Sequence, residues 1–222
     1  MRLVRGMSFS LKSVDSIFPT PLYQYEVADF ASLNRALLKE IDKRRSAEQG
    51  VAKSNRKGWH SATDLFERAE PAQAQVARIL AQALAQATRQ VAPDADMSGI
   101  QMVPEGWINV NQPGAFNAPH DHLGAFWSGC YYVSMPEDGG GIEFLSPHKP
   151  LPSMAGFRAP ITADKLTLRP KPGTVLIFPA TLVHWVQPND SKHERVTIAF
   201  NGRLRPKGAA KLHPAGGGQS RS

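Results

Sequence analysis

The stretch Arg195-Val-Thr-Ile-Ala-Phe-Asn201 alternates between two kinds of side chain along its length. Val196, Ile198 and Phe200 are large and apolar, whereas the residues between them are polar or small. Because successive side chains of a β-strand point to opposite faces, the alternation predicts a strand with one apolar face and one face toward a cavity. We expect the apolar face to pack against helices.

Other short stretches before this strand have the same character, with β-branched and aromatic residues between turn residues. Such short strands at turn-rich spacing are typical of a β-sandwich or barrel. The glycine-rich run 136–141 is interpreted as a hairpin connection, because clustered glycines accept positive φ angles. The further predicted strands are 107–110, 127–134, 142–145, 165–168, 175–178 and 182–186.

Two segments with helical periodicity precede the strands. From Asp29, apolar residues recur at three-to-four spacing as far as Ile41, and a charged end follows. A second helix is predicted to begin at Pro71 and to stop before Pro93, since proline is favoured at the first helical position. The predicted fold class is therefore mainly β with flanking helices, and residues 46–70 are expected to be irregular.

The length of 222 residues fits one domain, which we expect over residues 13–202. A basic tail, residues 203–222, is expected to be disordered because it has few large apolar residues. The single cysteine, Cys130, excludes an internal disulfide, and no apolar run is long enough for a membrane span. We expect a cytoplasmic protein without a membrane partner.

The net charge of +7 and the pI of 9.7 are those of many nucleic-acid-binding proteins. Most of the excess charge lies after residue 202, where the chain has five basic residues and no acid. Because the excess gathers in the expected tail, nucleic acid is not the expected partner. The five basic residues are Arg203, Arg205, Lys207, Lys211 and Arg221.

The run His120-Asp121-His122 places two imidazoles at positions i and i+2, and His184 follows 62 residues after the second. On an extended strand the pair would point to one side and could hold one ion. Two neighbouring ligands and a distant third can occupy one face of an octahedron, the arrangement of non-haem Fe(II) enzymes. Asp121 is an alternative third ligand if the strand is bulged at that position. His60, His148, His193 and His213 are interpreted as surface or capping residues.

Arg195 is predicted to lie on the cavity face of the last strand. A buried arginine needs an anionic partner, and a ligand carboxylate would supply one, with the Thr197 hydroxyl as an additional donor. Alternatively, Arg195 pairs with an internal acid such as Glu143 or lies on the surface. One of the neighbouring residues Tyr131 and Tyr132 is expected to face the cavity, and Cys130 is assigned no chemistry.

These segments together resemble the Fe(II)- and 2-oxoglutarate-dependent dioxygenases, near the prolyl 4-hydroxylase type, in a bacterial branch with H-x-H in place of H-x-D. The resemblance covers about half of the chain. Its segments are Trp107-Ile-Asn-Val-Asn-Gln-Pro-Gly114, Asn117-Ala-Pro-His-Asp-His122, Ser128-Gly-Cys-Tyr-Tyr-Val133, Gly141-Ile-Glu-Phe144, Pro172-Gly-Thr-Val-Leu-Ile-Phe-Pro179, His184-Trp-Val-Gln-Pro-Asn189 and Glu194-Arg-Val-Thr-Ile-Ala-Phe-Asn201.

The resemblance implies a double-stranded β-helix, a cupin-like jelly roll with N-terminal helices packed on one sheet. It also implies Fe(II), 2-oxoglutarate and molecular oxygen as cofactors, and hydroxylation of a substrate coupled to decarboxylation of 2-oxoglutarate to succinate. His120 and His184 match the family's histidine ligands, and His122 stands where the family has a carboxylate. The residues that match the 2-oxoglutarate pocket are Arg195, Thr197, Tyr132 and Asn111.

Replacing the carboxylate by His122 leaves the charge of Fe(II) unreduced, so we expect stronger attraction for the dianionic co-substrate. Two alternatives remain: a three-histidine cupin-type dioxygenase that uses no 2-oxoglutarate, and a non-catalytic jelly-roll module that binds a metal or an anion. The proline-rich segment 146–162 is interpreted as a possible lid, with Lys149 and Arg158 toward a substrate that is a small molecule or a protein side chain.

Overall fold

The computed structural model describes residues 10–51, 55–149, 151–152 and 162–208. Its helices are α1 (Phe30–Ala47), the 3-10 helix η1 (Leu65–Glu67) and α2 (Pro71–Val91). Its strands are β1 (Tyr23–Glu26), β2 (Asn55–His60), β3 (Ile100–His120), β4 (Trp127–Ser134), β5 (Ile142–Leu145), β6 (Lys165–Leu168), β7 (Thr174–Pro179), β8 (His184–Val186) and β9 (Arg195–Pro206).

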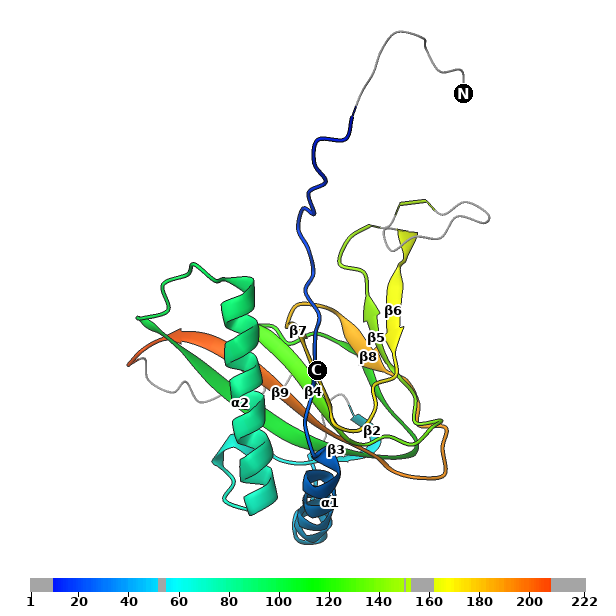
Figure 1. Ribbon diagram of the computed structural model, residues 1–222. Helices are drawn as coiled ribbons and strands as arrows, with labels where there is room; N and C mark the ends of the chain where they lie inside the picture. Colours follow the sequence, from blue (N-terminus) through cyan, green and yellow to red (C-terminus); the bar gives the residue numbers. More distant parts are fainter. Residues whose placement is uncertain (1–9, 52–54, 150, 153–161, 209–222) are drawn as a thin grey trace, which may run out of the picture.

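The strands pair in the order β1-β7-β4-β9-β3-β8-β5-β6, and β2 pairs with β3 beside this path. Every pairing among these strands is antiparallel. Strands that follow one another in the sequence, such as β3 and β4, are mostly not neighbours, so the chain crosses repeatedly between the two halves of a curled sheet (Figure 1). This is the arrangement of a jelly roll, and the predicted fold is confirmed.

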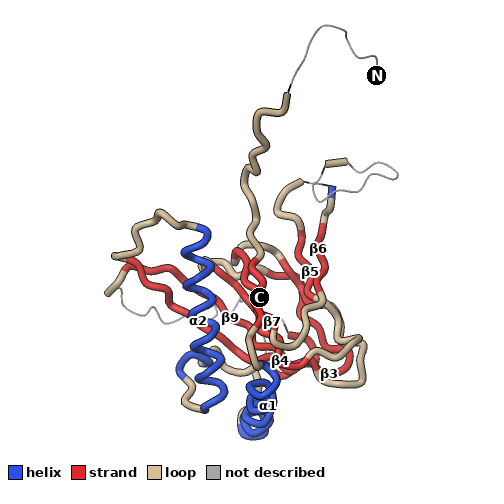
Figure 2. The backbone as a smooth tube through the Cα atoms, in the orientation of Figure 1, coloured by secondary structure: helices blue, strands red, loops and turns tan. Residues whose placement is uncertain are grey.

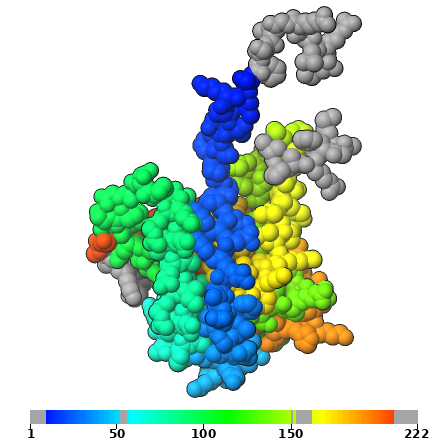
Figure 3. Space-filling model, viewed as in Figure 1, coloured from blue at the N-terminus to red at the C-terminus, as the bar shows by residue number. Residues whose placement is uncertain are grey.

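Helices α1 and α2 cover one face of the sheet (Figure 2) and lie side by side in the space-filling view (Figure 3). Leu37 and Leu80 are fully buried and pack in the same core as Val196, Ile198 and Phe200. The alternation along β9 therefore separates a face toward the helices from a face toward the cavity, as predicted. No helix in the described part of the chain is both long and apolar enough to cross a lipid bilayer.

The opposite face of the sheet carries a second apolar cluster, which closes one side of the cavity. Two of its members, Phe144 and Phe178, meet edge to face with ring centroids 4.8 Å apart. Strand parity also separates the two tyrosines of β4. Tyr131 points to the helices, where its hydroxyl donates to Asn34 Oδ1 at 2.6 Å, whereas Tyr132 points to the cavity.

The interpretation of 136–141 as a hairpin connection was wrong. Strand β4 pairs with β7 and β9, whereas β5 pairs with β6 and β8, so the glycine-rich run carries the chain from one half of the sheet to the other. Gly140 has φ 75°, and an added Cβ would lie 2.3 Å from Pro188 O. The glycines therefore allow a close backbone crossing with a left-handed residue.

Strand β9 extends past the predicted domain boundary at residue 202 as far as Pro206. Residues 203–206 pair with residues 100–103 of β3, and the Arg203 guanidinium lies 2.7 Å from Glu105 Oε1. The first part of the expected tail is thus ordered by a backbone ladder and an ion pair. Residues 209–222 lie outside the described residues.

Candidate metal and anion site

The pairing of β3 with β8 places His120 directly opposite His184. Residues opposite each other in an antiparallel pair have neighbouring side chains, which explains how two positions far apart in sequence meet. One ligand atom from each of His120, His122 and His184 lies within 4.8 Å of the others. Three imidazoles at this separation can enclose one metal ion.

His122 reaches this cluster from beyond the end of β3, not from within an extended strand. Its backbone N–H donates to Ala180 O at 2.9 Å, which anchors the turn after the strand. The His122 ring centroid lies 4.9 Å from that of His120 and 5.4 Å from that of His184. Asp121, the alternative third ligand, is not among the residues whose ligand atoms converge.

Backbone carbonyls orient two of the three rings. His120 Nδ1 lies 2.6 Å from Ala118 O, and His184 Nδ1 lies 2.9 Å from Leu182 O. A carbonyl oxygen only accepts hydrogen bonds, so each Nδ1 carries the proton and each Nε2 keeps its lone pair. This is the tautomer that binds a metal through Nε2.

Burial favours the neutral form of two of the clustered imidazoles, His122 and His184. Burial lowers the pKa of His122 to about 4, with further contributions from His120 and Arg203. Burial and the neighbouring His120 lower the pKa of His184 to about 3. Neutral imidazoles are the form that donates a lone pair to a metal, so the site is ready for a cation near neutral pH.

These pKa values predict how the stability of the metal-free protein depends on pH. The folded-state values lie below the ordinary value of 6.5, so the unfolded chain binds more protons in the acid range. The stabilising contribution is complete above about pH 6.5 and is lost as the pH falls toward 4. We expect the urea midpoint to fall between pH 7 and pH 4.5, and to fall less in His184→Gln. A His148→Gln control, at an exposed position, should show the same fall of the urea midpoint between pH 7 and pH 4.5 as the wild type. An equal fall in the wild type and in both variants would contradict the prediction.

Arg195 lies in the same cavity and is 1% exposed. Its Nη1 donates to Gly139 O and, at 3.0 Å, to Gln187 O, whereas the buried Nη2 has no hydrogen-bond partner among the described residues. No carboxylate lines this cavity among the described residues. Burial lowers the pKa of Arg195, as expected for a cation that lacks an anion. The arginine is therefore prepared for an anionic ligand.

The alternative pairing of Arg195 with Glu143 does not occur. Glu143 is buried on the other face of β5, where its carboxylate lies 3.3 Å from Lys165 Nζ. It also accepts hydrogen bonds from Thr167 Oγ1 at 3.0 Å and Trp185 Nε1 at 2.8 Å. The internal acid is thus satisfied by other donors.

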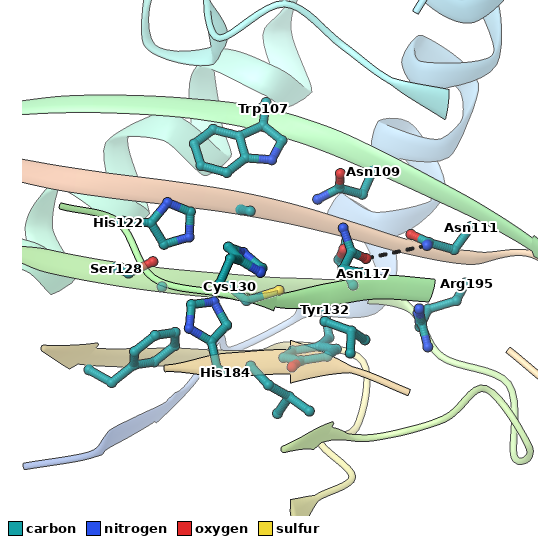
Figure 4. A pocket seen from close by; sticks show the side chains of 17 residues that line it. Trp107, Asn109, Asn111, Asn117, His122, Ser128, Cys130, Tyr132, His184 and Arg195 are labelled. Atoms are coloured by element: carbon teal, nitrogen blue, oxygen red, sulfur yellow. Dashed lines mark hydrogen bonds between the residues drawn. The ribbon is translucent and has the colours of Figure 1, made fainter. Parts of the chain in front are cut away.

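The other predicted pocket residues surround Arg195 through the strand registers. Asn111 lies opposite Arg195 between β3 and β9, and Tyr132 lies opposite Thr197 between β4 and β9. Figure 4 shows His122 and His184 toward one end of the cavity and Arg195 toward the other. The structure therefore brings the predicted metal ligands and the predicted anion-binding residues into one cavity.

Several residues of the cavity were missed by the sequence analysis. Asn109, opposite Thr197, is 7% exposed, and its Oδ1 has no hydrogen-bond partner. Trp107, Asn109 and Asn111 alternate along one strand and therefore share a face. This pattern could have identified Trp107 and Asn109 as cavity residues. Trp107, Asn117 and Ser128 also line the cavity (Figure 4).

His60, which was interpreted as a surface or capping residue, does not lie at the surface. It is 4% exposed, and its ring stacks on Trp107 with centroids 5.5 Å apart. Trp107 in turn lies against His122, with the two ring centroids 5.8 Å apart. His60 thus supports the wall of the cavity from the unpredicted strand β2, while its Nδ1 lies 2.6 Å from Ser61 O.

The remaining sequence predictions concern Cys130 and the possible lid. Cys130 lines the cavity, and burial raises its pKa to about 12, so the thiol stays protonated and is a poor nucleophile. Lys149 is exposed at the start of the proline-rich segment. Arg158 lies outside the described residues.

The donor set fits a metal with an anionic second ligand. Three neutral imidazoles leave the charge of a bound cation uncompensated, and Arg195 adds a positive charge at the other end of the cavity. A molecule with two carboxylates could bridge these two centres of charge. The orphaned guanidinium nitrogen is the specific sign that an anion belongs there.

Comparison with known proteins agrees with this geometry. Residues 105–201, which span β3 to β9, match a family model described as "Putative 2OG-Fe(II) oxygenase". No curated protein matches the chain. Among solved structures, the prolyl-4-hydroxylase of Pseudomonas putida is 19% identical, with 82% of this chain and 91% of that chain covered and a TM-score of 0.59.

Two further structures share the fold. The epimerase SnoN from nogalamycin biosynthesis, in complex with Fe3+, alpha ketoglutarate and nogalamycin RO, is 15% identical over 90% of this chain and 88% of that chain, with a TM-score of 0.60. HygX from Streptomyces hygroscopicus, with nickel, 2-oxoglutarate and hygromycin B bound, is 13% identical over 87% and 86%, with a TM-score of 0.59. The family match includes the strands that build the cavity, and the solved structures share the fold, so residues 105–201 are similar to the oxygenases that use Fe(II) and 2-oxoglutarate.

Proposed function

We propose that this protein is an Fe(II)- and 2-oxoglutarate-dependent hydroxylase that binds Fe(II) through His120, His122 and His184. In the proposed reaction, 2-oxoglutarate and O2 are consumed, succinate and carbon dioxide are released, and a C–H bond of the substrate becomes C–OH. The substrate is a small molecule or a protein side chain. Asp121 is left outside the proposed ligand set because its carboxylate does not converge with the imidazoles.

The observation that carries the proposal is the orphaned Nη2 of Arg195 in the cavity that the three histidines line. A histidine cluster alone would suit many metals and many functions. A buried guanidinium without an acid adds the requirement for an anionic ligand, and its fork geometry matches a carboxylate. We therefore assign Arg195 to the distal carboxylate of 2-oxoglutarate.

The neighbours of Arg195 complete the proposed co-substrate pocket. The Thr197 and Tyr132 hydroxyls, opposite each other across β4 and β9, can donate to the same carboxylate. Burial raises the pKa of Tyr132 well above its ordinary value, so the phenol keeps the proton that it would donate. Asn111, opposite Arg195, has an amide that can contact the chain of the co-substrate.

Bound Fe(II) supplies the redox chemistry that couples decarboxylation of the keto acid to oxidation of the substrate. The protein orients the ligands and excludes water. Ile142, Phe178 and Val186 form an apolar wall beside the histidines. Such a wall lowers the local dielectric and strengthens the attraction between the cationic site and a dianion.

An anaerobic titration tests the proposal. Metal-free protein is loaded with Fe(II) and then titrated with 2-oxoglutarate, and we expect the visible metal-to-ligand charge-transfer band of a chelated keto acid. Pyruvate is the matched control, because it has the keto-acid end but lacks the distal carboxylate that Arg195 is proposed to bind. It should produce the band only at much higher concentration.

The other outcomes separate the alternatives. Oxygen uptake that does not depend on 2-oxoglutarate would indicate a three-histidine dioxygenase. Metal binding without a charge-transfer band and without succinate formation under air would indicate a non-catalytic binding module. Both results would contradict the proposed function.

A further inference from the structure

One of the three histidines is oriented differently from the others. His120 and His184 each present Nδ1 to a backbone carbonyl, whereas His122 Nδ1 lies 3.4 Å from the side-chain nitrogen of Asn201. An amide nitrogen is a donor, so the nitrogen that it faces must be the one with the lone pair. In this state His122 holds its proton on Nε2, the opposite tautomer to its two neighbours.

Asn201 shares a face of β9 with Thr197 and Ala199, which line the cavity, and is 3% exposed. It lies opposite Glu105 on β3 and opposite Ser128 on β4. Its Nδ2 also donates to Glu105 Oε1 at 3.0 Å, while its Oδ1 is buried without a hydrogen-bond partner. A buried amide oxygen without a donor is costly, so an unused acceptor here indicates a second state of the side chain.

Glu105 holds the amide in its present orientation. Its Oε1 also lies 2.7 Å from the Arg203 guanidinium, which is partly exposed. The result is a chain of contacts from Arg203 through Glu105 and Asn201 to His122. Rotation of the amide by half a turn would exchange its oxygen and nitrogen and break the hydrogen bond to Glu105. The Glu105 carboxylate would then turn away from the amide oxygen and keep Arg203 as its partner.

We propose that Asn201 is the positioning residue that selects the tautomer of His122, with Glu105 setting the orientation of Asn201. This inference rests on the proposed function, in which His122 is a metal ligand. A histidine that binds metal through Nε2 must carry its proton on Nδ1 and needs an acceptor there. On metal binding the Asn201 amide rotates, and its unused Oδ1 accepts a hydrogen bond from His122 Nδ1–H.

The tautomers can be measured directly, without turnover, by long-range 1H–15N correlation spectra of the histidine rings. In the metal-free protein we expect the Nε2–H form for His122 and the Nδ1–H form for His120 and His184. Saturation with Zn2+, which is redox-inert, should give the Nδ1–H form in all three rings. Finding His122 already in the Nδ1–H form without metal would overturn the inference.

A paired exchange provides the decisive variant. The double variant Glu105→Gln/Asn201→Asp conserves the total charge and can keep the hydrogen bond between the two residues, with its direction reversed. The group that faces His122 becomes a pure acceptor. We expect His122 to adopt the Nδ1–H form in the metal-free double variant, and an unchanged tautomer would again overturn the inference.

Zn2+ affinity separates this inference from the proposed function. Asn201→Leu should weaken Zn2+ binding by about tenfold to a hundredfold, the usual effect of losing a partner of a metal ligand. Asn34→Leu is the matched control, since Asn34 is also buried but bonds to Val133 O on the helix side of the sheet. Equal losses in both variants would assign the effect to general destabilisation and overturn the positioning role.

His122→Ala completes the comparison. If this variant binds Zn2+ as tightly as the wild type, His122 is not a metal ligand, and the ligand set of the proposed function is wrong. If it weakens binding while Asn201→Leu leaves both the affinity and the His122 tautomer unchanged, only the role of Asn201 is overturned.

Discussion

Replacing Arg195 by methionine is expected to weaken the binding of 2-oxoglutarate by about 30-fold or more and to leave Fe(II) binding unchanged. Truncating one partner of a buried, hydrogen-bonded charge pair costs about 2–5 kcal/mol, and every 1.4 kcal/mol is a factor of ten. Arg195 has no carboxylate partner among the described residues, so we expect the lost free energy to appear in the affinity for the ligand. Titration of the charge-transfer band with 2-oxoglutarate measures the change.

Stability provides a check on this variant. Because methionine removes a buried cation that has no anion beside it, the urea midpoint should not fall steeply, despite the loss of two bonds to backbone carbonyls. Arg205→Met, farther along the same strand, is the control and should bind 2-oxoglutarate as the wild type does. An unchanged affinity in Arg195→Met would show that the co-substrate carboxylate is bound elsewhere.

The alternation of side chains explains why much of the fold was predictable. On β9 a strict two-residue period separates Ile198, which packs under the helices, from Thr197, which faces the cavity. The same parity assigns Tyr131 and Tyr132 to opposite faces. Such patterns are local in sequence, so a single chain is enough to interpret them.

The elements that the sequence did not reveal depend on partners far away in the chain. Strand β2 is polar and glycine-containing, and it forms because β3 offers it a backbone ladder from Asn109 to Asn117. The crossing at 136–141 was missed for a related reason. Its glycines are compatible with a hairpin and with a close crossing, and only the pairing of β4 with β9 and of β5 with β8 distinguishes them.

The candidate site, like the fold, could be predicted from the sequence only in part. His120, His122 and Arg195 could be selected from residue type and spacing, because imidazole pairs and an inward-facing guanidinium have few uses in a cavity. The contact of Asn201 with Glu105 and His122 could not be selected, since it depends on the register between β3 and β9 and on the turn after His120. Register is a tertiary property that hydrophobic patterns constrain only in part.

The second large effect is expected for His122→Ala, which removes the third proposed metal ligand. Its affinity for Fe(II) or Zn2+ should be lower than that of the wild type by a factor of about one hundred or more. Loss of a direct ligand should exceed the roughly 10- to 100-fold effect of losing an outer partner. Asp121→Ala is the matched control in the adjacent position, and it should retain wild-type affinity because Asp121 does not converge on the cluster. Isothermal titration of the metal-free proteins measures both.

Exchanging the ligand instead of deleting it tests the charge argument. In His122→Asp the carboxylate can still bind the metal, so we expect affinity for Fe(II) to be largely retained, while the added negative charge opposes the dianionic co-substrate. The 2-oxoglutarate titration should therefore shift to higher concentration although the metal remains bound. The reverse result, with strong metal loss in Asp121→Ala and little in His122→Ala, would make Asp121 the third ligand and would mean that the turn after β3 rearranges when metal binds.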